Sequence, residues 1–220
     1  MRHLSRLYFK YICHISRHQH QSYNYLDKPK KMPQGKIKCG YGPTNSYTLS
    51  SPIGDIEVVS CPKGLHSLKQ AGDTDEYFSP DTKIKVSVKS QLYNDNGYTY
   101  KPALLCEDWL QHYFTSSVDQ LKTPPICHSI FTEGSFCGAA WKTLTEKVPF
   151  GETISYKNLA GLCGNERACR AAGLAMRTNP ISIIVPCHRV ISHSGKLGNY
   201  SGGHKNKVKQ WLLAHENAIP

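Results

Sequence analysis

The run Ile184-Val185-Pro186-Cys187-His188-Arg189-Val190 contains the residues of this sequence best suited to do chemistry. A cysteine attacks as its thiolate, and because a free thiol has a pKa of about 8.5, it needs a neighbouring base or cation at neutral pH. His188 could be that base, acting through a water molecule, since adjacent side chains of an extended segment point in opposite directions. Glu216 is a candidate to orient the imidazole. Taken alone, however, a Cys-His pair is more often a buried structural cysteine beside a histidine.

The elements that must position this run are predicted to be helices. An apolar stripe that stops at Pro149 and Gly151 predicts one helix, and it consists of Phe136, Ala140, Trp141, Leu144 and Val148. After the run, Val208, Trp211 and Leu212 recur at helical spacing. This last helix should end at His215-Glu216, so that Glu216 can fold back toward Cys187.

Between these helices the sequence predicts two shorter ones. Ser155 can cap a helix that ends at Leu162. Gly164-Asn165 then predicts a turn with a cap, followed by a second helix over residues 166–177. The second helix is rich in alanine and glycine, which would permit close approach to a nucleic-acid groove. Two short helices joined by a glycine-containing turn indicate a helix-turn-helix.

The middle of the chain predicts strands and one helix. Apolar residues alternate with polar ones around Ile56 and Val58 and again at Ile84, Val86 and Val88, so each segment should bury one face. A helix should follow, with its apolar face formed by Leu105, Trp109, Leu110, Tyr113 and Phe114. This unit ends near Pro124-Pro125.

The predicted fold class is therefore α+β with two domains. A small N-terminal domain with a short antiparallel sheet should cover residues 45–125. A mostly helical, winged-helix-like domain that contains the helix-turn-helix should cover residues 130–220.

Charge and cysteine content narrow the function classes. The net charge of +11 divides into +8 over residues 1–40, −3 over 41–130 and +6 over 131–220, as expected if the C-terminal half meets a polyanion. Ordinary solvated lysines are the alternative. Nine cysteines without framework spacing indicate a reducing compartment with free or metal-bound thiols. No stretch approaches the roughly 20 apolar residues of a membrane helix, so we expect a soluble protein.

Residues 1–40 are basic and lack a convincing period. We interpret them as a disordered extension outside the fold. A mitochondrial presequence and a nucleic-acid-binding arm are the alternatives.

Several motifs in order resemble one family. Pro186 precedes the cysteine, an apolar entry covers residues 181–185, and the loop Gly198-Asn199-Tyr200-Ser201-Gly202-Gly203 follows. Together with Phe-Gly-Glu-Thr-Ile-Ser-Tyr, Ala-Met-Arg-Thr-Asn-Pro and Trp-Leu-Leu-Ala-His-Glu, they resemble the O6-alkylguanine-DNA alkyltransferases, the methylated-DNA–protein-cysteine methyltransferase family. The resemblance extends from about Tyr47 to Glu216 and is densest from Phe150 onward.

The resemblance implies DNA repair by a methylated-DNA–protein-cysteine S-methyltransferase. Cys187 would accept the alkyl group from O6 of guanine, or less well from O4 of thymine, and Glu216, His188 and a bridging water would deprotonate it. The substrate would be double-stranded DNA, bound through its minor groove with the damaged base flipped out. We expect a monomer, resident in the nucleus unless the leader directs it to mitochondria.

The resemblance also assigns roles to residues of this sequence. Tyr156 would donate a hydrogen bond or proton to the departing guanine, and Arg170 would fill the gap left by the flipped nucleotide. The implied DNA-binding residues are Asn165, Ala168, Arg170, Arg177, Tyr156 and Ser201. The implied pocket residues are Met176, Asn179, Val190, Tyr200, Ser201 and Gly202.

Sulfur chemistry predicts that each molecule acts once. A thiolate suits in-line displacement at an sp³ carbon, whereas the product thioether is a poor leaving group. No cofactor is required for the transfer. Two alternatives are a non-catalytic protein that binds alkylation damage, which Cys187 argues against, and a cysteine hydrolase that uses Cys187 and His188.

Vertebrate members of the resembled family carry a structural zinc, held by two cysteines and two histidines. Cys61-Pro-Lys-Gly-Leu-His66 matches the central pair of ligands. Cys39 lies near the first position and Cys127 falls where the second histidine is expected. Cys39, Cys61, His66 and Cys127 would make a tetrahedral Cys₃His site, with unliganded thiols as the alternative.

Two departures from the family pattern concern the pocket. Ser182 stands where mammalian members have a proline that lines the alkyl pocket. Two residues are inserted after Gly203, within His204-Lys205-Asn206-Lys207. The preferred alkyl group and the sensitivity to benzyl inhibitors are therefore open.

Overall fold

The computed structural model describes residues 39–72, 75–93, 97–115, 122–131 and 133–219, all within one unit of residues 32–220. Apart from Cys39 and Gly40, the basic segment predicted over residues 1–40 lies outside these ranges. The predicted boundaries between the domains at 45–125 and 130–220 stay predictions. Among the described residues, every helix is too short or too polar to traverse a bilayer.

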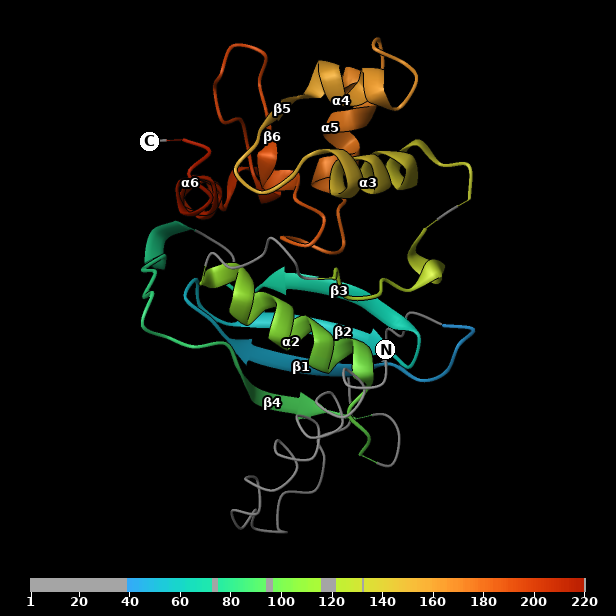
Figure 1. The fold of residues 1–220 in the computed structure, drawn as a ribbon, viewed down its shortest axis with the longest axis vertical. Helices are drawn as coiled ribbons and strands as arrows, with labels where there is room; N and C mark the ends of the chain where they lie inside the picture. The colour runs from blue at the N-terminus through green and yellow to red at the C-terminus, as the bar shows by residue number, and fades with distance from the viewer. Residues whose placement is uncertain (1–38, 73–74, 94–96, 116–121, 132, 220) are drawn as a thin grey trace, which may run out of the picture. The chain divides into compact units, whose positions relative to one another are not determined.

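The first half of the described chain is built on a four-stranded antiparallel sheet of order β3-β2-β1-β4 (Figure 1). Its strands are β1 (Asn45–Ser50), β2 (Ile56–Cys61), β3 (Gly64–Gln70) and β4 (Ser87–Leu92). Tyr47 of β1 pairs with Val58 of β2, and both side chains are buried. The alternation of apolar and polar residues thus correctly predicts β2 and its buried face.

Strand β4 corrects the prediction for residues 84–88. Val86 is buried, but Ile84 and Val88 are 42% and 37% exposed. The strand begins only at Ser87 and pairs with β1 through a bulge, so alternation does not carry across its start. The backbone at Val86 is tied to the following helix, since its N–H donates to Oε1 of Gln111 at 2.8 Å.

That helix, α2 (Lys101–Phe114), contacts β2 and β3 (Figure 1). Pro102 in its first turn favours initiation because this position needs no intrahelical N–H bond. Cys106, Leu110 and Tyr113 are fully buried. Leu105 is 37% exposed, so its predicted place on the buried face is wrong. Leu110 and Tyr113 are buried as predicted, and Pro102, Ala103 and Cys106 complete the buried stripe.

The second half contains four helices in the described residues: α3 (Phe136–Lys147), α4 (Tyr156–Leu162), α5 (Cys169–Arg177) and α6 (Asn206–His215). Ser155 caps α4 as predicted, since its hydroxyl accepts from the backbone N–H of Asn158 at 3.1 Å. Helix α6 ends at His215, with Glu216 as its C-cap, also as predicted.

Helix α5 starts three residues later than predicted. Asn165 does not cap it; the Asn165 side chain accepts from the N–H of Arg167 at 3.1 Å and stabilises a separate turn. Ala172 and Ala175 are fully buried where α5 packs on α3, and Nε1 of Trp141 donates to the carbonyl of Ala175 at 2.7 Å. The small residues therefore serve helix packing on one face of α5.

Four short 3₁₀ turns and two short strands complete the described elements. The turns are η1 (Asp75–Tyr77), η2 (His128–Ile130), η3 (Cys187–Arg189) and η4 (Ser201–Gly203). Strands β5 (Ile154–Ser155) and β6 (Val190–Ile191) pair in parallel. Residues 180–182 pair with β3, through Leu68 N–H to Pro180 at 2.8 Å and Ser182 N–H to Leu68 at 2.9 Å. The segment that leads to Cys187 is thus anchored on the sheet.

Candidate active site

Cys187 opens the η3 turn and is 5% exposed. Asn179 holds it: its Nδ2 donates to the Cys187 sulfur at 3.0 Å and to the carbonyl of Val185 at 2.8 Å. Its Oδ1 accepts from the N–H of Ile181 at 2.9 Å. Because one amide bridges both ends of the approach segment, it fixes the sulfur relative to the sheet. Ile183 in this segment has φ 71°, a strained left-handed conformation that such anchoring must maintain.

The groups around Cys187 shift the pKa of its thiol in opposite directions. Burial raises the pKa, whereas hydrogen bonds from Asn179 and Tyr200 and the charge of Lys209 lower it, and the net result is a raised pKa. Lys209 is itself buried, and its Nζ donates to the carbonyls of Val190 at 2.7 Å and Leu197 at 2.5 Å. Burial lowers the pKa of Lys209 to about 8. The resting cysteine is therefore a thiol that needs a base.

His188 and Glu216 form a fully buried pair, with Nε2 and Oε1 2.7 Å apart. Burial lowers the pKa of His188, and Glu216 offsets part of that effect. Nδ1 of His188 has no hydrogen-bond partner among the described residues. With the proton on Nε2, this Nδ1 is a neutral acceptor, the state that a general base requires.

Glu216 is compensated by further donors. Arg189 donates through Nε to Oε2 at 2.7 Å and through Nη2 to Oε1 at 3.0 Å. The Tyr113 hydroxyl donates to Oε1 at 2.6 Å. Burial alone would raise the pKa of Glu216, but His188 and Arg189 outweigh burial and hold it well below its usual value. The carboxylate is thus ionised and fixed.

A cavity of about 260 Å³ opens onto the sulfur. The predicted pocket residues that line it are Met176, Tyr200, Ser201 and Gly202, together with Cys187 and Tyr156. Burial first, and then Cys187, raise the pKa of Tyr156, so its hydroxyl keeps its proton and can donate. Val190 is fully buried and Asn179 nearly so, and neither lines this cavity. Asn179 reaches the sulfur directly, whereas Val190 pairs with Ile154 in the small sheet.

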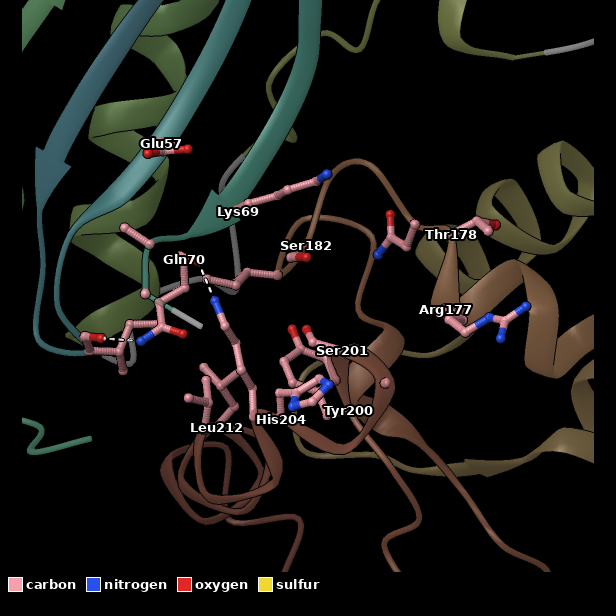
Figure 2. Close-up of a pocket in the computed structure, with 18 residues that line it drawn as sticks. Glu57, Lys69, Gln70, Arg177, Thr178, Ser182, Tyr200, Ser201, His204 and Leu212 are labelled. Carbon is pink, nitrogen blue, oxygen red and sulfur yellow. Dashed lines mark hydrogen bonds between the residues drawn. The ribbon is translucent and has the colours of Figure 1, made fainter. Parts of the chain in front are cut away.

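Figure 2 shows the residues that line a second cavity. This cavity has a volume of about 840 Å³ and shares Arg177, Tyr200, Ser201 and Gly202 with the first. Ser182 lines this larger cavity and not the one that contains Cys187. The inserted segment contacts the sheet half, because Lys205 Nζ donates to the carbonyl of Gln70 at 2.5 Å and Lys207 N–H to Asp75 at 2.8 Å. The two departures from the family pattern therefore meet at this cavity.

The predicted DNA-binding residues are mostly exposed. Asn165, Arg170, Arg177 and Ser201 are exposed, and Ala168 and Tyr156 are half-buried. They lie on or beside α4 and α5 and on the loop that bounds the smaller cavity. Arg177 lines the cavity that opens onto the sulfur, whereas Arg170 lies exposed at the start of α5.

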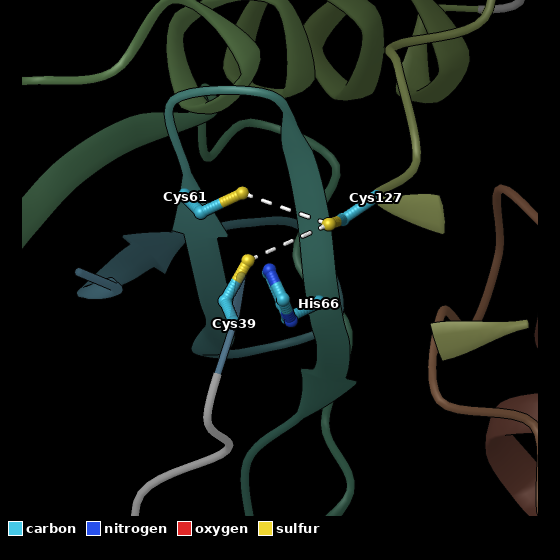
Figure 3. Close-up of side chains that lie close together, drawn as sticks. All are labelled: Cys39, Cys61, His66 and Cys127. Carbon is cyan, nitrogen blue, oxygen red and sulfur yellow. Dashed lines mark hydrogen bonds between the residues drawn. The ribbon is translucent and has the colours of Figure 1, made fainter. Parts of the chain in front are cut away.

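Cys39, Cys61, His66 and Cys127 lie together, with their ligand atoms within 4.8 Å of one another (Figure 3). The sulfur of Cys127 lies 3.8 Å from that of Cys39 and 3.7 Å from that of Cys61. Both ring nitrogens of His66 are buried without a hydrogen-bond partner among the described residues. Three thiols and an unpaired imidazole fit a tetrahedral divalent ion.

Sequence reasoning missed Tyr113, Arg189 and Lys209 as site residues. Arg189 stands in the motif itself, and Lys209 interrupts the apolar face of α6 between Val208 and Leu212, which is a usable signal. In the sequence, Tyr113 has the pattern of an ordinary core aromatic, because only the fold brings its hydroxyl to Glu216.

Comparison with known proteins gives a consistent result. A family model described as the DNA-binding domain of 6-O-methylguanine DNA methyltransferase matches residues 135–218. The methylated-DNA–protein-cysteine methyltransferase of Homo sapiens is 40% identical over 171 residues, which cover 77% of this chain and 78% of the relative. The protein of that name from Shigella flexneri is 42% identical over 176 residues, covering 78% and 94%.

Solved structures agree. Mycobacterium tuberculosis OGT in complex with DNA has a TM-score of 0.56 at 33% identity and covers 78% of this chain and 91% of its own. The M. tuberculosis O6-methylguanine methyltransferase has a TM-score of 0.57 at 33% identity, covering 80% and 95%. The predicted resemblance and the α+β fold class are confirmed. The chain belongs to the methylated-DNA–protein-cysteine methyltransferase family.

Proposed function

We propose that this protein repairs DNA by irreversible transfer of an alkyl group from O6 of guanine to Cys187. The observation that carries the proposal is the placement of a buried, hydrogen-bonded cysteine on a cavity beside a fixed His188–Glu216 pair. Membership of the family supports the substrate class.

In the proposed reaction, the thiol proton of Cys187 passes through one water to Nδ1 of His188, while Glu216 stabilises the resulting imidazolium. The sulfur attacks the alkyl carbon in line, so the S–C bond forms as the C–O6 bond breaks. The bonding electrons go to the guanine, and the Tyr156 hydroxyl donates to the departing base. Guanine remains in the DNA, and Cys187 becomes a thioether that nothing in the reaction restores.

Stoichiometry tests the single-use character. Purified protein mixed with a tenfold excess of O6-methylguanine oligonucleotide should remove one methyl group per protein and then stop. Continued turnover would contradict the proposal, and binding without any methyl loss would indicate a damage-binding protein instead.

We further propose that α4 and α5 act as a helix-turn-helix in the minor groove and that the target base flips into the 260 Å³ cavity. Arg170 at the exposed start of α5 would stack in the vacated space and offset part of the few kcal/mol that flipping costs. Arg170→Ala should then slow repair of duplex DNA at least tenfold, yet leave reaction with the free modified base unchanged. Lys157→Ala on exposed α4 is the control for loss of charge. Equal loss on both substrates would contradict the role of Arg170.

We also propose that Cys39, Cys61, His66 and Cys127 hold a structural zinc, which would cross-link the chain before β1, strands β2 and β3 and the segment at 127. When bound, zinc would supply folding energy and take no part in the transfer. Metal analysis should find one zinc per wild-type chain and none in Cys61→Ser. Cys106→Ser, a buried cysteine outside the cluster, should retain the metal. Zinc-free wild-type protein would contradict the site.

Finally, we propose that the protein acts as a monomer in the nucleus. A DNA substrate and the basic balance of the chain support this compartment. A fluorescent fusion of the full chain should colocalise with nuclear DNA. Colocalisation with mitochondria would favour a targeting role for residues 1–40 instead.

A further inference from the structure

A hydrogen bond joins helix α2, which packs on the four-stranded sheet, to the His188–Glu216 pair beside Cys187. Tyr113 lies in the last turn of α2, and its hydroxyl donates to Oε1 of Glu216, 103 residues later in the chain, at 2.6 Å. Tyr113 is fully buried and Glu216 is 1% exposed. Because both groups are buried, the hydrogen bond lies in a low-dielectric interior, where it is electrostatically stronger than in water.

The tyrosine is fixed by its neighbours. Its ring stacks on that of Trp109, with 5.4 Å between the ring centroids, and meets the ring of Phe150 edge-on, with 5.8 Å between centroids. Its backbone carbonyl accepts from the side-chain Nε2 of His215 at 2.8 Å, so a second hydrogen bond joins α2 to α6. The hydroxyl therefore stays on the carboxylate.

Three donors share one oxygen of Glu216. Oε1 accepts from Tyr113 at 2.6 Å, from His188 Nε2 at 2.7 Å and from Arg189 Nη2 at 3.0 Å. A carboxylate oxygen offers about two lone pairs, so the three donors compete for its charge. The Tyr113 hydroxyl thus limits how strongly Glu216 can stabilise a protonated His188.

We propose that Tyr113 is a positioning residue for alkyl transfer, whose hydroxyl sets the orientation and basicity of the Glu216–His188 pair. This inference rests on the proposed function, in which His188 takes the Cys187 proton. The charged and titratable groups that interact with the pair come from four elements: Tyr113 from α2, Arg189 from η3, Tyr200 beside η4, and Lys209 from α6.

The test compares Tyr113→Phe with wild type in single-turnover methyl transfer between pH 5 and 9, with protein in excess over a methylated oligonucleotide. Tyr113→Phe removes one hydrogen-bond donor from Oε1 of Glu216, so more of the negative charge on this oxygen faces His188. The charge stabilises protonated His188 and raises the pKa of its imidazole. The acid limb of the rate profile should therefore move to higher pH by roughly 0.5–1 unit. Tyr47→Phe is the control, because it removes another buried hydroxyl of the sheet half, which accepts from the N–H of Tyr100. It should leave the limb in place.

NMR titration of the His188 ring in the unreacted protein gives a second readout and should show the same upward shift in Tyr113→Phe. If that variant does not fold, 3-fluorotyrosine at position 113 keeps the shape with a better donor and should move both readouts to lower pH. If neither variant shifts the acid limb of the pH-rate profile or the titration of the His188 ring, the proposal is overturned. Absence of methyl transfer in wild type would sink the proposed function, whereas the NMR titration would still test the link through Tyr113.

Discussion

Glu216 is the residue on which most of the buried charge depends. It is ionised, 1% exposed, and accepts from His188, Arg189 and Tyr113. Such a network is stable only while it is complete, because each remaining charge would otherwise stand unpaired in a low-dielectric interior. The relay and the stability of the fold thus share one carboxylate.

Replacement of Glu216 by glutamine should therefore destabilise the protein as well as slow transfer. The buried guanidinium of Arg189 loses its counter-charge, and breaking such a pair costs about 3–5 kcal/mol. Urea unfolding followed by circular dichroism measures the loss. Glu152→Gln, an exposed glutamate, should change stability by less than about 0.5 kcal/mol. Equal stabilities for the two variants would contradict the assigned network.

Asn179 offers a test with almost no change in shape. Asn179→Asp would replace the donor 3.0 Å from the Cys187 sulfur by a negative charge. The pKa of the thiol should rise by at least about one unit, and methyl transfer at neutral pH should slow about tenfold or more. Asn158→Asp on the exposed start of α4 is the matched control. Single-turnover rates decide, and equal rates in the two variants would rule out a role for the amide in stabilising the thiolate.

Among the elements, strand β3 depends on one glycine. A Cβ on Gly64 would lie 2.4 Å from the backbone nitrogen of Cys127 and 2.6 Å from the carbonyl carbon of Ile126. The segment that carries Cys127 pairs with β3 through hydrogen bonds to Leu65. Only glycine permits this approach, and through it Cys127 reaches Cys61 and His66.

Gly64→Ala should consequently push Cys127 out of the cluster. We expect a loss of about 1–3 kcal/mol of stability, because backbone atoms must shift. If the cluster holds zinc as proposed, the variant should also bind less of it. Denaturation and metal analysis on the same sample measure both effects. Gly40→Ala, where the added Cβ meets nothing within 4 Å, should leave both unchanged. Full zinc content in Gly64→Ala would show that the approach is not needed for the site.

The elements that could be predicted are those whose signals are local. The apolar stripe of α3, the serine cap of α4 and the end of α6 follow from neighbouring residues, and the structure contains all three. β4 and α5 begin later than their patterns predict, because β4 pairs with β1 through a bulge and Asn165 stabilises a separate turn before α5. Strand pairing is a tertiary contact, and the hydrogen bond of Asn165 to the backbone competes with helix formation. The spacing of apolar residues therefore does not predict either of them.

At the scale of the whole molecule, acid should destabilise the protein in two steps. The pKa values of His188 and Glu216 are both lowered in the folded state. The unfolded chain therefore binds each proton first, below about pH 6.5 for the histidine and below about 4.3 for the glutamate. The free energy of unfolding is therefore largest above about pH 6.5. It decreases as the pH falls below this value and decreases further below about pH 4.3.

Urea midpoints at pH 7.5, 5.5 and 4.0 should therefore decrease in that order. In Glu216→Gln, the urea midpoint should depend less on pH below about 4.3, because the glutamine side chain does not titrate. A midpoint that stays constant or rises toward acid would contradict the lowered pKa values.

The candidate site was predicted less completely than the fold. Cys187, His188, Tyr156 and Glu216 could be named because they lie in recognisable motifs, and the structure gathers them. Tyr113 is supplied by α2, and the direction of its side chain follows from the packing of the two halves rather than from any local pattern. The larger cavity likewise forms only where the inserted loop meets β3.

The central claim is that one specific sulfur is consumed. After incubation with an O6-methylguanine duplex, peptide mass spectrometry should find one added methyl group on the Cys187 peptide, and the peptides of the other described cysteines should be unmodified. Cys187→Ser should bind the duplex and acquire none. A methyl group on any other cysteine, or an unmodified Cys187 after the DNA has lost its methyl group, would contradict the account.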